Sequence, residues 1–250
     1  MSARFGQHFL TDSAVIDRII ASLPKGDFDS VIEIGPGKGA ITKRLINLFP
    51  ENLHLIELDK RLLPKLESRF SSAHIFNEDA VKFDYNSVSG ENILCVGNLP
   101  YEISSPLLFA LSEYTPIKEM YFMVQHEFAL RAVASKGKEV GRLSFMLQVF
   151  FHVFYDWEVL PEAFSPPPKV LSAMMHLQRR DKPLTTRIRE LDYLLKLAFS
   201  KRRKMLRQIF KNVDVDFSSL EINPEYRPEQ VSLSQWVNWA EVFQLPVEPQ

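Results

Sequence analysis

The sequence contains one cysteine, Cys95, among 250 residues, which excludes a disulfide bond within the chain. Cys95 lies in a short apolar run, and we expect it to be buried. No run of about 20 apolar residues and no signal-peptide pattern occurs, which argues against a membrane-spanning or secreted protein. With 46% hydrophobic and 24% charged residues, the composition is typical of a globular protein. We therefore expect a cytoplasmic protein without a membrane partner.

The chain also lacks a large excess of charge of either sign. Its formal net charge is −1, which does not by itself indicate a nucleic-acid-binding protein. The six histidines are scattered, and neither they nor the cysteine have the spacing of a metal site. We expect no catalytic metal.

What the sequence does contain is an alternation of short apolar runs and helix-like segments up to about residue 180. This alternation predicts an α/β fold with a mostly parallel sheet and helices on both faces. The expected strands are 30–34, 53–58, 74–78, 93–97, 120–125, 149–160 and 172–178, and the last two are expected to form a hairpin-like pair. From residue 181 to 250 the periodicity is helical, with expected helices at 188–199, 203–210, 218–222 and 234–243. We therefore expect a domain at 1–180 and a small helical domain at 181–250.

A glycine-rich loop follows the first expected strand of this sheet. Gly35, Gly37 and Ala40 fit the dinucleotide-binding pattern G-x-G-x-x-G/A, and a helix is expected from Ala40 to Phe49. Glu57 lies about 20 residues further on, where that fold places a ribose-binding acid. Nicotinamide dinucleotide binding is therefore one reading of the loop.

Two other residues favour S-adenosylmethionine over a dinucleotide. Pro36 removes a backbone N–H from the loop, whereas a pyrophosphate is bound through such donors. Asp79 follows the strand expected at 74–78, so a second acid lies at a neighbouring strand end. Two acids suit a nucleoside whose ribose hydroxyls and adenine amino group both need acceptors, although Asp79 also fits a helix cap.

The segment Asn98-Leu99-Pro100-Tyr101 follows the strand expected at 93–97. An asparagine amide can both donate and accept in the plane of a base edge, and a tyrosine ring can cover a base face. Pro100 biases Leu99 toward an extended backbone and fixes the direction of the nearby carbonyls. Taken alone, the four residues also fit an ordinary strand-to-helix turn.

Several motifs together resemble the family of ribosomal RNA small-subunit adenine dimethyltransferases. The resemblance spans almost the whole chain, in the order Gly6-Gln7-His8-Phe9-Leu10, Glu33-Ile34-Gly35-Pro36-Gly37, Ile56-Glu57-Leu58-Asp59, Asp79-Ala80, Asn98-Leu99-Pro100-Tyr101, Gly141-Arg142-Leu143-Ser144, Ala163–Val170, Arg202-Arg203-Lys204 and Arg227-Pro228-Glu229-Gln230. It implies a Rossmann-like, seven-stranded class I methyltransferase sheet with a small C-terminal helical domain.

The resemblance also implies S-adenosylmethionine as cofactor. It assigns His8 and Leu10 to the methionine end and Gly35 to the glycine-loop contact. It assigns Glu57 to the ribose hydroxyls and Asp79 to the adenine amino group. Gln7 is expected to help order the N-terminal segment over the site.

The implied reaction is methyl transfer to the exocyclic nitrogen of adenine. The Asn98 side-chain oxygen and the Leu99 carbonyl would accept the two N–H bonds of that nitrogen, and Asn98 would also contact the cofactor. Tyr101 would stack on the target base, in a turn fixed by Pro100. Phe164 would cover the other face of the base from an exposed, proline-rich loop.

The chain departs from the family pattern at a few positions. His8 replaces the usual Asn, Lys38 replaces a usual Leu beside the glycine loop, Leu171 stands where Asp is common, and Met205 replaces a usual Thr. The sequence also begins close to Arg4, with almost none of the basic N-terminal arm of many relatives. None of these departures removes a residue that the chemistry requires.

The segment from Lys196 to Lys211 contains seven basic residues and no acidic residue. Such a local patch can neutralise phosphates although the whole chain is nearly neutral. The expected RNA-binding residues are Lys201, Arg202, Arg203, Lys204 and Arg207. A solvated helix face is the alternative interpretation.

The resemblance therefore predicts an enzyme that dimethylates the N6 of two adjacent adenosines in a loop near the 3′ end of small-subunit (16S) ribosomal RNA. Its partner would be that RNA or the immature small subunit, and we expect a monomer. Two alternatives remain: a large-subunit RNA adenine methyltransferase and a non-catalytic assembly factor with the same fold. The intact set of Asn98, Tyr101, Glu57 and Asp79 disfavours the assembly factor, and the Gly141–Ser144 and Arg227–Gln230 segments favour the small-subunit family.

Overall fold

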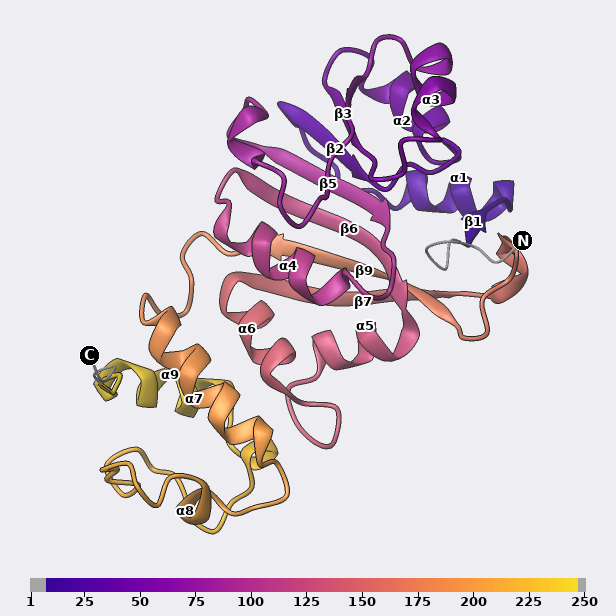
Figure 1. The fold of residues 1–250 in the computed structure, drawn as a ribbon. Coiled ribbons are helices and arrows are strands. Elements are labelled where there is room, and N and C mark those ends of the chain that lie inside the picture. The colour runs from indigo at the N-terminus through magenta and orange to yellow at the C-terminus, as the bar shows by residue number, and fades with distance from the viewer. Residues whose placement is uncertain (1–7, 247–250) are drawn as a thin grey trace. The chain divides into compact units, whose positions relative to one another are not determined.

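A computed structural model describes residues 8–246 of the chain. A seven-stranded sheet has the strand order β4-β3-β2-β5-β6-β9-β7, and a separate two-stranded sheet pairs β1 with β8 (Figure 1). The strands are β1 Phe9–Leu10, β2 Ser30–Ile34, β3 Leu53–Ile56, β4 His74–Phe76, β5 Ile93–Asn98, β6 Ile117–Gln125, β7 Phe151–Val159, β8 Phe164–Ser165 and β9 Ser172–Arg179. The α/β class and the seven-stranded sheet are as predicted.

Five strands of the large sheet run parallel to one another. β2 pairs in parallel with β3 and with β5, β3 with β4, and β5 with β6. β9 is antiparallel to β6 and lies between β6 and β7. The two strands expected to pair as a hairpin, β7 and β9, are therefore neighbours.

The strand expected at 149–160 starts later than predicted. Residues Arg142–Phe150 form the helix α6, and β7 begins at Phe151. Apolar residues continue without a break from Val149 in α6 to Phe151 in β7, so an apolar run alone does not mark the change from helix to strand.

Helices alternate with the strands in the first half of the chain. These are α1 Ser13–Ala21, α2 Thr42–Leu48, α3 Leu63–Arg69, α4 Ser104–Glu113 and α5 His126–Val133. Residues of α1 and α2 join the apolar cluster that covers one face of the sheet, including Ile19, Leu45 and Val31. α4 packs against β6 and lies in front of the sheet in Figure 1. Cys95 is fully buried in β5, as predicted.

The chain divides into two compact units. The first comprises the residues up to Ala129 together with His152–Arg179, and the second comprises Leu130–Phe151 and the residues from Arg180 onward. The second of the two stretches that form this unit starts at Arg180, and the sequence predicted the domain boundary between residues 180 and 181. The unit also contains Leu130–Phe151, which sequence reasoning assigned to the first domain.

The second unit is helical, with α6, α7 Ile188–Ser200, α8 Leu206–Ile209 and α9 Leu233–Val242. Its core contains Trp236 and Trp239, whose rings stack with centroids 5.3 Å apart, and Phe210, whose ring lies 4.5 Å from that of Trp239. No helix within residues 8–246 is long and apolar enough to cross a membrane.

Two expected helices differ from the structure. The helix expected at 203–210 begins only at Leu206, because Met205 has an extended backbone (φ −71°, ψ 151°). The segment expected to be helical at 218–222 forms turns instead. Asp216 accepts the backbone N–H groups of Ser218 and Ser219, and Glu221 has a positive φ of 54°, which ends any helical path.

Candidate functional site

The strand order of the sheet reverses at β2, which lies between β3 on one side and β5 on the other. In open α/β sheets, ligands bind at the carboxyl ends of the strands next to such a reversal. The glycine loop follows β2, Glu57 follows β3, Asp79 lies three residues after the end of β4, and Leu99 follows β5. The fold thus brings these predicted site residues to one edge of the sheet.

The backbone at this edge is tightly packed and uses glycines where side chains do not fit. Gly35 and Gly37 have φ of 66° and 60°, a conformation that other residues rarely adopt. A Cβ on Gly97 would lie 2.4 Å from the backbone oxygen of Ile34, so β5 approaches β2 too closely for a side chain there. The loops after β2 and β5 are therefore held against one another.

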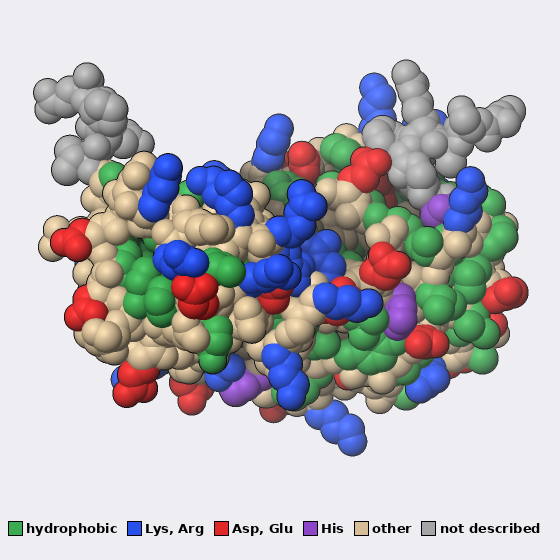
Figure 2. All heavy atoms as spheres, turned by 90° about the horizontal axis from the view of Figure 1, so that it is seen from below, with side chains coloured by type: hydrophobic (Ala, Val, Ile, Leu, Met, Phe, Trp, Pro, Cys, Tyr) green, Lys and Arg blue, Asp and Glu red, His purple; other side chains and the backbone are tan. Residues whose placement is uncertain are grey.

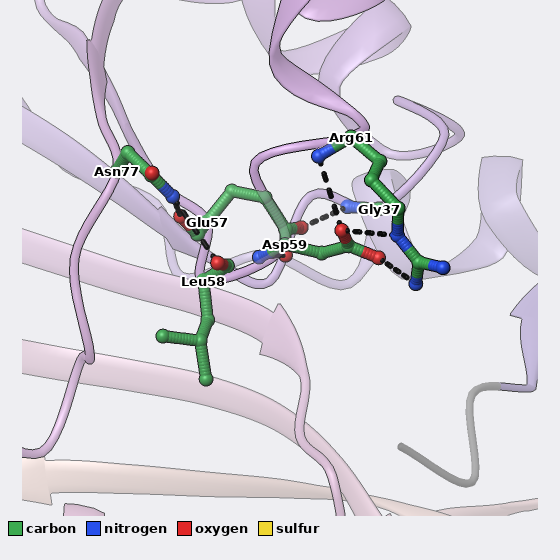
Figure 3. Close-up of polar contacts among 6 residues, drawn as sticks. All are labelled: Gly37, Glu57, Leu58, Asp59, Arg61 and Asn77. Carbon is green, nitrogen blue, oxygen red and sulfur yellow. Dashed lines mark hydrogen bonds and ion pairs between the residues drawn. The ribbon is translucent and has the colours of Figure 1, made fainter. Parts of the chain in front are cut away.

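Glu57 lies at the end of β3 with its carboxylate turned toward the glycine loop (Figure 3). Its Oε2 accepts the backbone N–H of Gly37 at 3.0 Å, and its Oε1 accepts that of Asp59 at 2.8 Å. Asn77, which follows β4, donates to the backbone oxygen of Glu57 at 2.8 Å. A carboxylate oxygen can accept a second hydrogen bond, so Glu57 keeps the capacity to accept two hydroxyl groups.

Burial raises the pKa of Glu57 above its usual value, and the N–H groups of Asp59 and Gly37 oppose the rise. The side chain is only 5% exposed. Next to it, Asp59 forms an ion pair with Arg61, whose Nε lies 2.7 Å from Oδ1, and this hydrogen bond lowers the pKa of Asp59. Asp59 thus remains a carboxylate whose charge is paired locally.

Asp79 is half-buried, and its Oδ1 accepts the backbone N–H of Val81 at 3.0 Å. This bond closes a turn, and no helix begins at Asp79, so the helix-cap interpretation of this residue is wrong. Its Oδ2 accepts no hydrogen bond within the described residues and can serve an amino group.

Asn98, the last residue of β5, uses its side chain to hold the N-terminal segment. Its Nδ2 donates to the backbone oxygen of His8 at 3.2 Å. The backbone N–H of Leu99 donates to Met123 on β6 at 2.9 Å. Within residues 8–246, neither the Asn98 Oδ1 nor the Leu99 carbonyl accepts a hydrogen bond, so two acceptors lie next to each other after β5.

The N-terminal segment crosses the glycine loop. β1 pairs with β8, and the His8 Nδ1 lies 2.8 Å from the backbone oxygen of Pro166. A Cβ on Gly37 would lie 3.3 Å from the Phe9 ring, and the Lys38 Nζ lies 4.1 Å from the centroid of that ring. The Lys38 substitution thus adds a cation–π contact to the loop. Gly6 and Gln7 lie outside the described residues.

Leu10 and Phe164 lie opposite each other in the β1–β8 pair, and both are buried. Phe164 is only 4% exposed and belongs to the apolar cluster of the first unit. The exposed position predicted for Phe164 is therefore wrong. Its neighbours Ser165 and Pro166 are exposed, so the prolines correctly indicated an exposed loop. They did not indicate that the Phe164 ring points into the core.

Tyr101 is half-buried after the Asn98–Pro100 turn, and its hydroxyl lies 3.5 Å from the Ser172 Oγ, at the limit of a hydrogen bond. Pro100 is exposed, and its backbone oxygen accepts the hydroxyl of Ser104 at 3.2 Å. This bond helps to start α4 directly after the turn. The ring of Tyr101 is therefore placed mainly by the turn and only weakly by its hydroxyl.

Sequence reasoning gave no role to Glu33, although it quoted the motif that contains this residue. Glu33 is 2% exposed in β2, and its Oε2 has no hydrogen-bond partner in the described chain. Burial raises the pKa of Glu33 to about 7, against an opposing effect of the Thr42 hydroxyl. A carboxyl group inside a strand of apolar residues was the signal that could have identified it.

The expected RNA-binding residues lie in the second unit and differ in their partners. Lys201, Arg203 and Lys204 are exposed and form no ion pair within the described part of the chain. Arg207 pairs with Glu225 at 2.7 Å, and Arg202 pairs with Glu229 at 3.6 Å. An open hollow is lined by Lys201, Lys204, Arg207, Gln208 and Lys211. Figure 2 shows a face of the molecule on which Lys and Arg side chains gather.

The chain matches the family model described as ribosomal RNA adenine dimethylase over residues 1–245. It is 43% identical to the ribosomal RNA small subunit methyltransferase A of Dechloromonas aromatica over 95% of both chains. It is 40% identical to the protein of the same name from Herminiimonas arsenicoxydans, over 94% of this chain and 95% of that one.

Solved structures agree with this match. A dimethyladenosine transferase from Plasmodium falciparum has a TM-score of 0.78 and 28% identity, over 92% of this chain and 94% of that chain. The 23S rRNA methyltransferase ErmE has a TM-score of 0.73 and 24% identity, over 93% of this chain and 98% of that chain. The likeness to ErmE concerns the fold alone.

Proposed function

Because the chain belongs to the ribosomal RNA adenine dimethylase family, we propose that it dimethylates the N6 of two adjacent adenosines in a loop near the 3′ end of small-subunit (16S) ribosomal RNA. The chain is an S-adenosylmethionine-dependent methyltransferase with a class I methyltransferase fold. Relatives of about 40% identity are named for the small subunit, which supports that RNA over the large-subunit alternative.

The residues at the carboxyl edge of the sheet fit S-adenosylmethionine. Glu57 supplies two carboxylate oxygens to the ribose hydroxyls, and its bond to Gly37 holds the carboxylate at the glycine loop. Asp79 would accept the adenine amino group with its Oδ2. Because Gly35 has no side chain, the cofactor can approach its backbone closely. His8 would contact the methionine end from the N-terminal segment, and Leu10, which is buried in the β1–β8 pair, would hold that segment in place.

The single observation that carries the proposed reaction is the pair of unused acceptors after β5. S-adenosylmethionine supplies a methyl group on a positively charged sulfur. The exocyclic nitrogen of adenine attacks poorly while its lone pair is delocalised into the ring. In the first transfer, the Asn98 Oδ1 and the Leu99 carbonyl would accept the two N–H bonds of this nitrogen, which favours a tetrahedral nitrogen with a localised lone pair. In the second transfer, one N–H bond remains to be accepted. After each transfer, the methylated nitrogen releases one proton to water. The site then contributes mainly orientation.

Tyr101 would stack on the target base, which must leave its stack to enter the site. The burial of Phe164 leaves that ring no free face to cover the base, so its role is to fix the β1–β8 pair and through it the N-terminal segment. Pro100 fixes the turn between the acceptors and Tyr101.

The second unit would bind RNA phosphates through Lys201, Arg203 and Lys204, with Arg207 beside them. Their exposure and the hollow between them support this role. Since ribosomal RNA is the substrate of the family, the immature small subunit is the proposed partner. We further propose that the chain acts in the cytoplasm as a monomer.

One experiment tests the proposal. The protein is incubated with labelled S-adenosylmethionine and with unmethylated small or large ribosomal subunits, and the labelled adenines are mapped. We expect label on two adjacent adenosines of the small subunit only. Label on the large subunit would replace the proposed substrate. Binding to small subunits without any label would favour the assembly factor.

A further inference from the structure

Three motifs of the sequence that the reaction does not use meet in the second unit. The first, Gly141–Ser144, opens α6 and holds the base of the loop 134–141, which connects α5 to α6. The Ser144 Oγ donates to the backbone oxygen of Arg131 at 2.5 Å and accepts the N–H of Gly141 at 3.0 Å. One turn later, the Gln148 Nε2 donates to the backbone oxygen of Ala134 at 2.9 Å.

The second motif, Arg202-Arg203-Lys204, holds the tip of the same loop. The Arg202 Nη2 donates to the backbone oxygen of Lys138 at 2.5 Å and lies 3.4 Å from that of Gly137. Gly137 has a φ of 84°, so the loop turns sharply next to the carbonyl groups that Arg202 contacts. The loop is therefore bound at both its base and its tip.

The third motif, Arg227–Gln230, supplies the counter-charge. The Glu229 Oε2 lies 3.6 Å from the Arg202 Nε, and this oxygen is buried without a hydrogen bond. The side chain of Glu229 is 20% exposed and that of Arg202 is 36% exposed. The carboxylate therefore orients the planar guanidinium through its Nε, while the Nη2 donates to the loop.

These contacts separate Arg202 from its neighbours. Lys201, Arg203 and Lys204 are exposed, whereas the Arg202 Nη2 donates within the protein and its Nε lies beside Glu229. The loop itself presents Lys136 and Lys138 to solvent, and the Lys138 side chain is 92% exposed. Because Arg202 follows Lys201 directly and binds the carbonyl of Lys138, the loop lysines lie on the same part of the surface as Lys201.

We propose that Arg202 is a positioning residue which, oriented by Glu229, holds the loop 134–141 so that Lys136 and Lys138 join Lys201 and Lys204 in one phosphate-binding surface. This inference rests on the proposed function, because the phosphates are those of ribosomal RNA. It differs from the sequence prediction, in which Arg202 contacts RNA itself.

The change Glu229→Gln gives opposite results under the two interpretations. It removes a negative charge from a basic surface, so a direct phosphate role for Arg202 predicts equal or tighter binding to unmethylated small subunits. Positioning predicts binding weaker by roughly 3- to 10-fold, in the range of indirect coupling. The matched control is Glu225→Gln, which removes the same charge beside Arg207 and should leave binding equal or tighter.

The change Arg202→Lys gives a second contrast. Lysine keeps the charge but lacks the planar fork that binds a carboxylate and carbonyls together. A phosphate contact would survive this change, whereas positioning predicts weakened binding similar to that of Glu229→Gln. Lys136→Gln combined with Lys138→Gln should weaken binding and lower its salt slope by about 1 for each lost phosphate contact.

The loop can be followed without RNA. Trypsin cleaves after Lys136 and Lys138, and we expect cleavage there to rise about tenfold in Arg202→Lys and Glu229→Gln, because cleavage follows the population of the open loop. Arg203→Gln is the control and should leave the rate unchanged. S-adenosylmethionine affinity, measured by calorimetry, should stay at the wild-type value in all of these variants, since the cofactor residues belong to the first unit.

The outcomes are distinct. Faster cleavage together with weaker subunit binding in Glu229→Gln supports the inference. Unchanged cleavage, or tighter binding in Glu229→Gln, overturns it, and so does faster cleavage with wild-type binding. If the wild-type protein itself neither binds nor methylates small subunits, the proposed function fails instead.

Discussion

The side-chain amide of Asn98 donates a hydrogen bond to the backbone oxygen of His8 at 3.2 Å. This bond orients the amide, because the nitrogen must face the N-terminal segment and the oxygen must then face away from it. It also explains why a histidine is compatible with this position. Asn98 binds the backbone of residue 8, and the ring bonds separately to Pro166.

For this reason, Asn98→Ala should leave a folded protein that binds small subunits but transfers methyl groups about 10²–10³ times more slowly, since one preorganised acceptor is lost. Single-turnover methylation, with subunit binding measured in parallel, tests this. A wild-type rate in the folded variant would remove the catalytic role of Asn98.

Tyr101 should act through its ring. Among residues 8–246 the hydroxyl has a single long contact, 3.5 Å to Ser172, so Tyr101→Phe should keep most of the activity. Tyr101→Ala should lower the rate strongly, because base–aromatic stacking contributes about 1–3 kcal/mol. The same single-turnover assay distinguishes the two variants, and equal losses in both would show that the hydroxyl is essential.

Glu57→Gln should weaken S-adenosylmethionine binding by about 1.5–3 kcal/mol, as expected for hydrogen bonds to a charged group. The amide also replaces an oxygen that accepts a backbone N–H in the wild-type protein. Titration calorimetry measures the effect. Glu78→Gln, at an exposed residue after β4, is the matched control and should bind as the wild type does. Equal affinities of the two folded variants would contradict the ribose assignment.

Glu33 should make stability depend on pH. Its pKa rises from 4.5 in the unfolded chain to about 7 in the folded protein, so the folded state holds the proton more strongly. The stabilisation from this proton is fully present below pH 4.5 and is lost as the pH rises toward 7. Glu33→Gln should therefore gain stability relative to the wild type over this range, by up to about 3 kcal/mol at pH 8.

Urea unfolding of both proteins at pH 4.5, 6 and 8 measures the difference, with the exposed Glu78→Gln as control. A difference that does not grow with pH would mean that folding does not raise the pKa of Glu33.

Gly97→Ala should destabilise the protein and weaken cofactor binding together. A Cβ at this position would lie 2.4 Å from the Ile34 oxygen, so β5 must move away from β2. Overpacking of this kind typically costs about 1–3 kcal/mol. Gly26→Ala, whose Cβ would meet only the Phe28 ring at 3.5 Å, is the control. Thermal unfolding and calorimetry measure the two effects, and a stable Gly97→Ala variant with normal affinity would contradict this account.

The sequence predicted the sheet well because each parallel strand is a short apolar run bounded by turn residues, as at Ser30–Ile34 and Ile93–Asn98. It predicted element ends less well. At Met205 and Phe151 the change of backbone conformation depends on capping and on pairing with distant strands, which composition does not report.

The site residues could be found because they follow strand ends, and strand ends share one edge of a parallel sheet. Phe164 was misjudged because its prolines indicate an exposed loop, whereas its burial depends on pairing with β1, more than 150 residues away in the chain. Arg202 resembles its basic neighbours in sequence, and only its contacts with Lys138 and Glu229 distinguish it.

The second compact unit is made of two separate stretches of chain, Leu130–Phe151 and the residues from Arg180 onward. α6 packs on α7, with the rings of Phe145 and Phe199 6.1 Å apart. A chimera that exchanges only the residues after 180 with a relative would therefore join a foreign α7 to the resident α6. Exchanges intended to move RNA preference between relatives should carry both stretches together, with three junctions, at 129/130, 151/152 and 179/180.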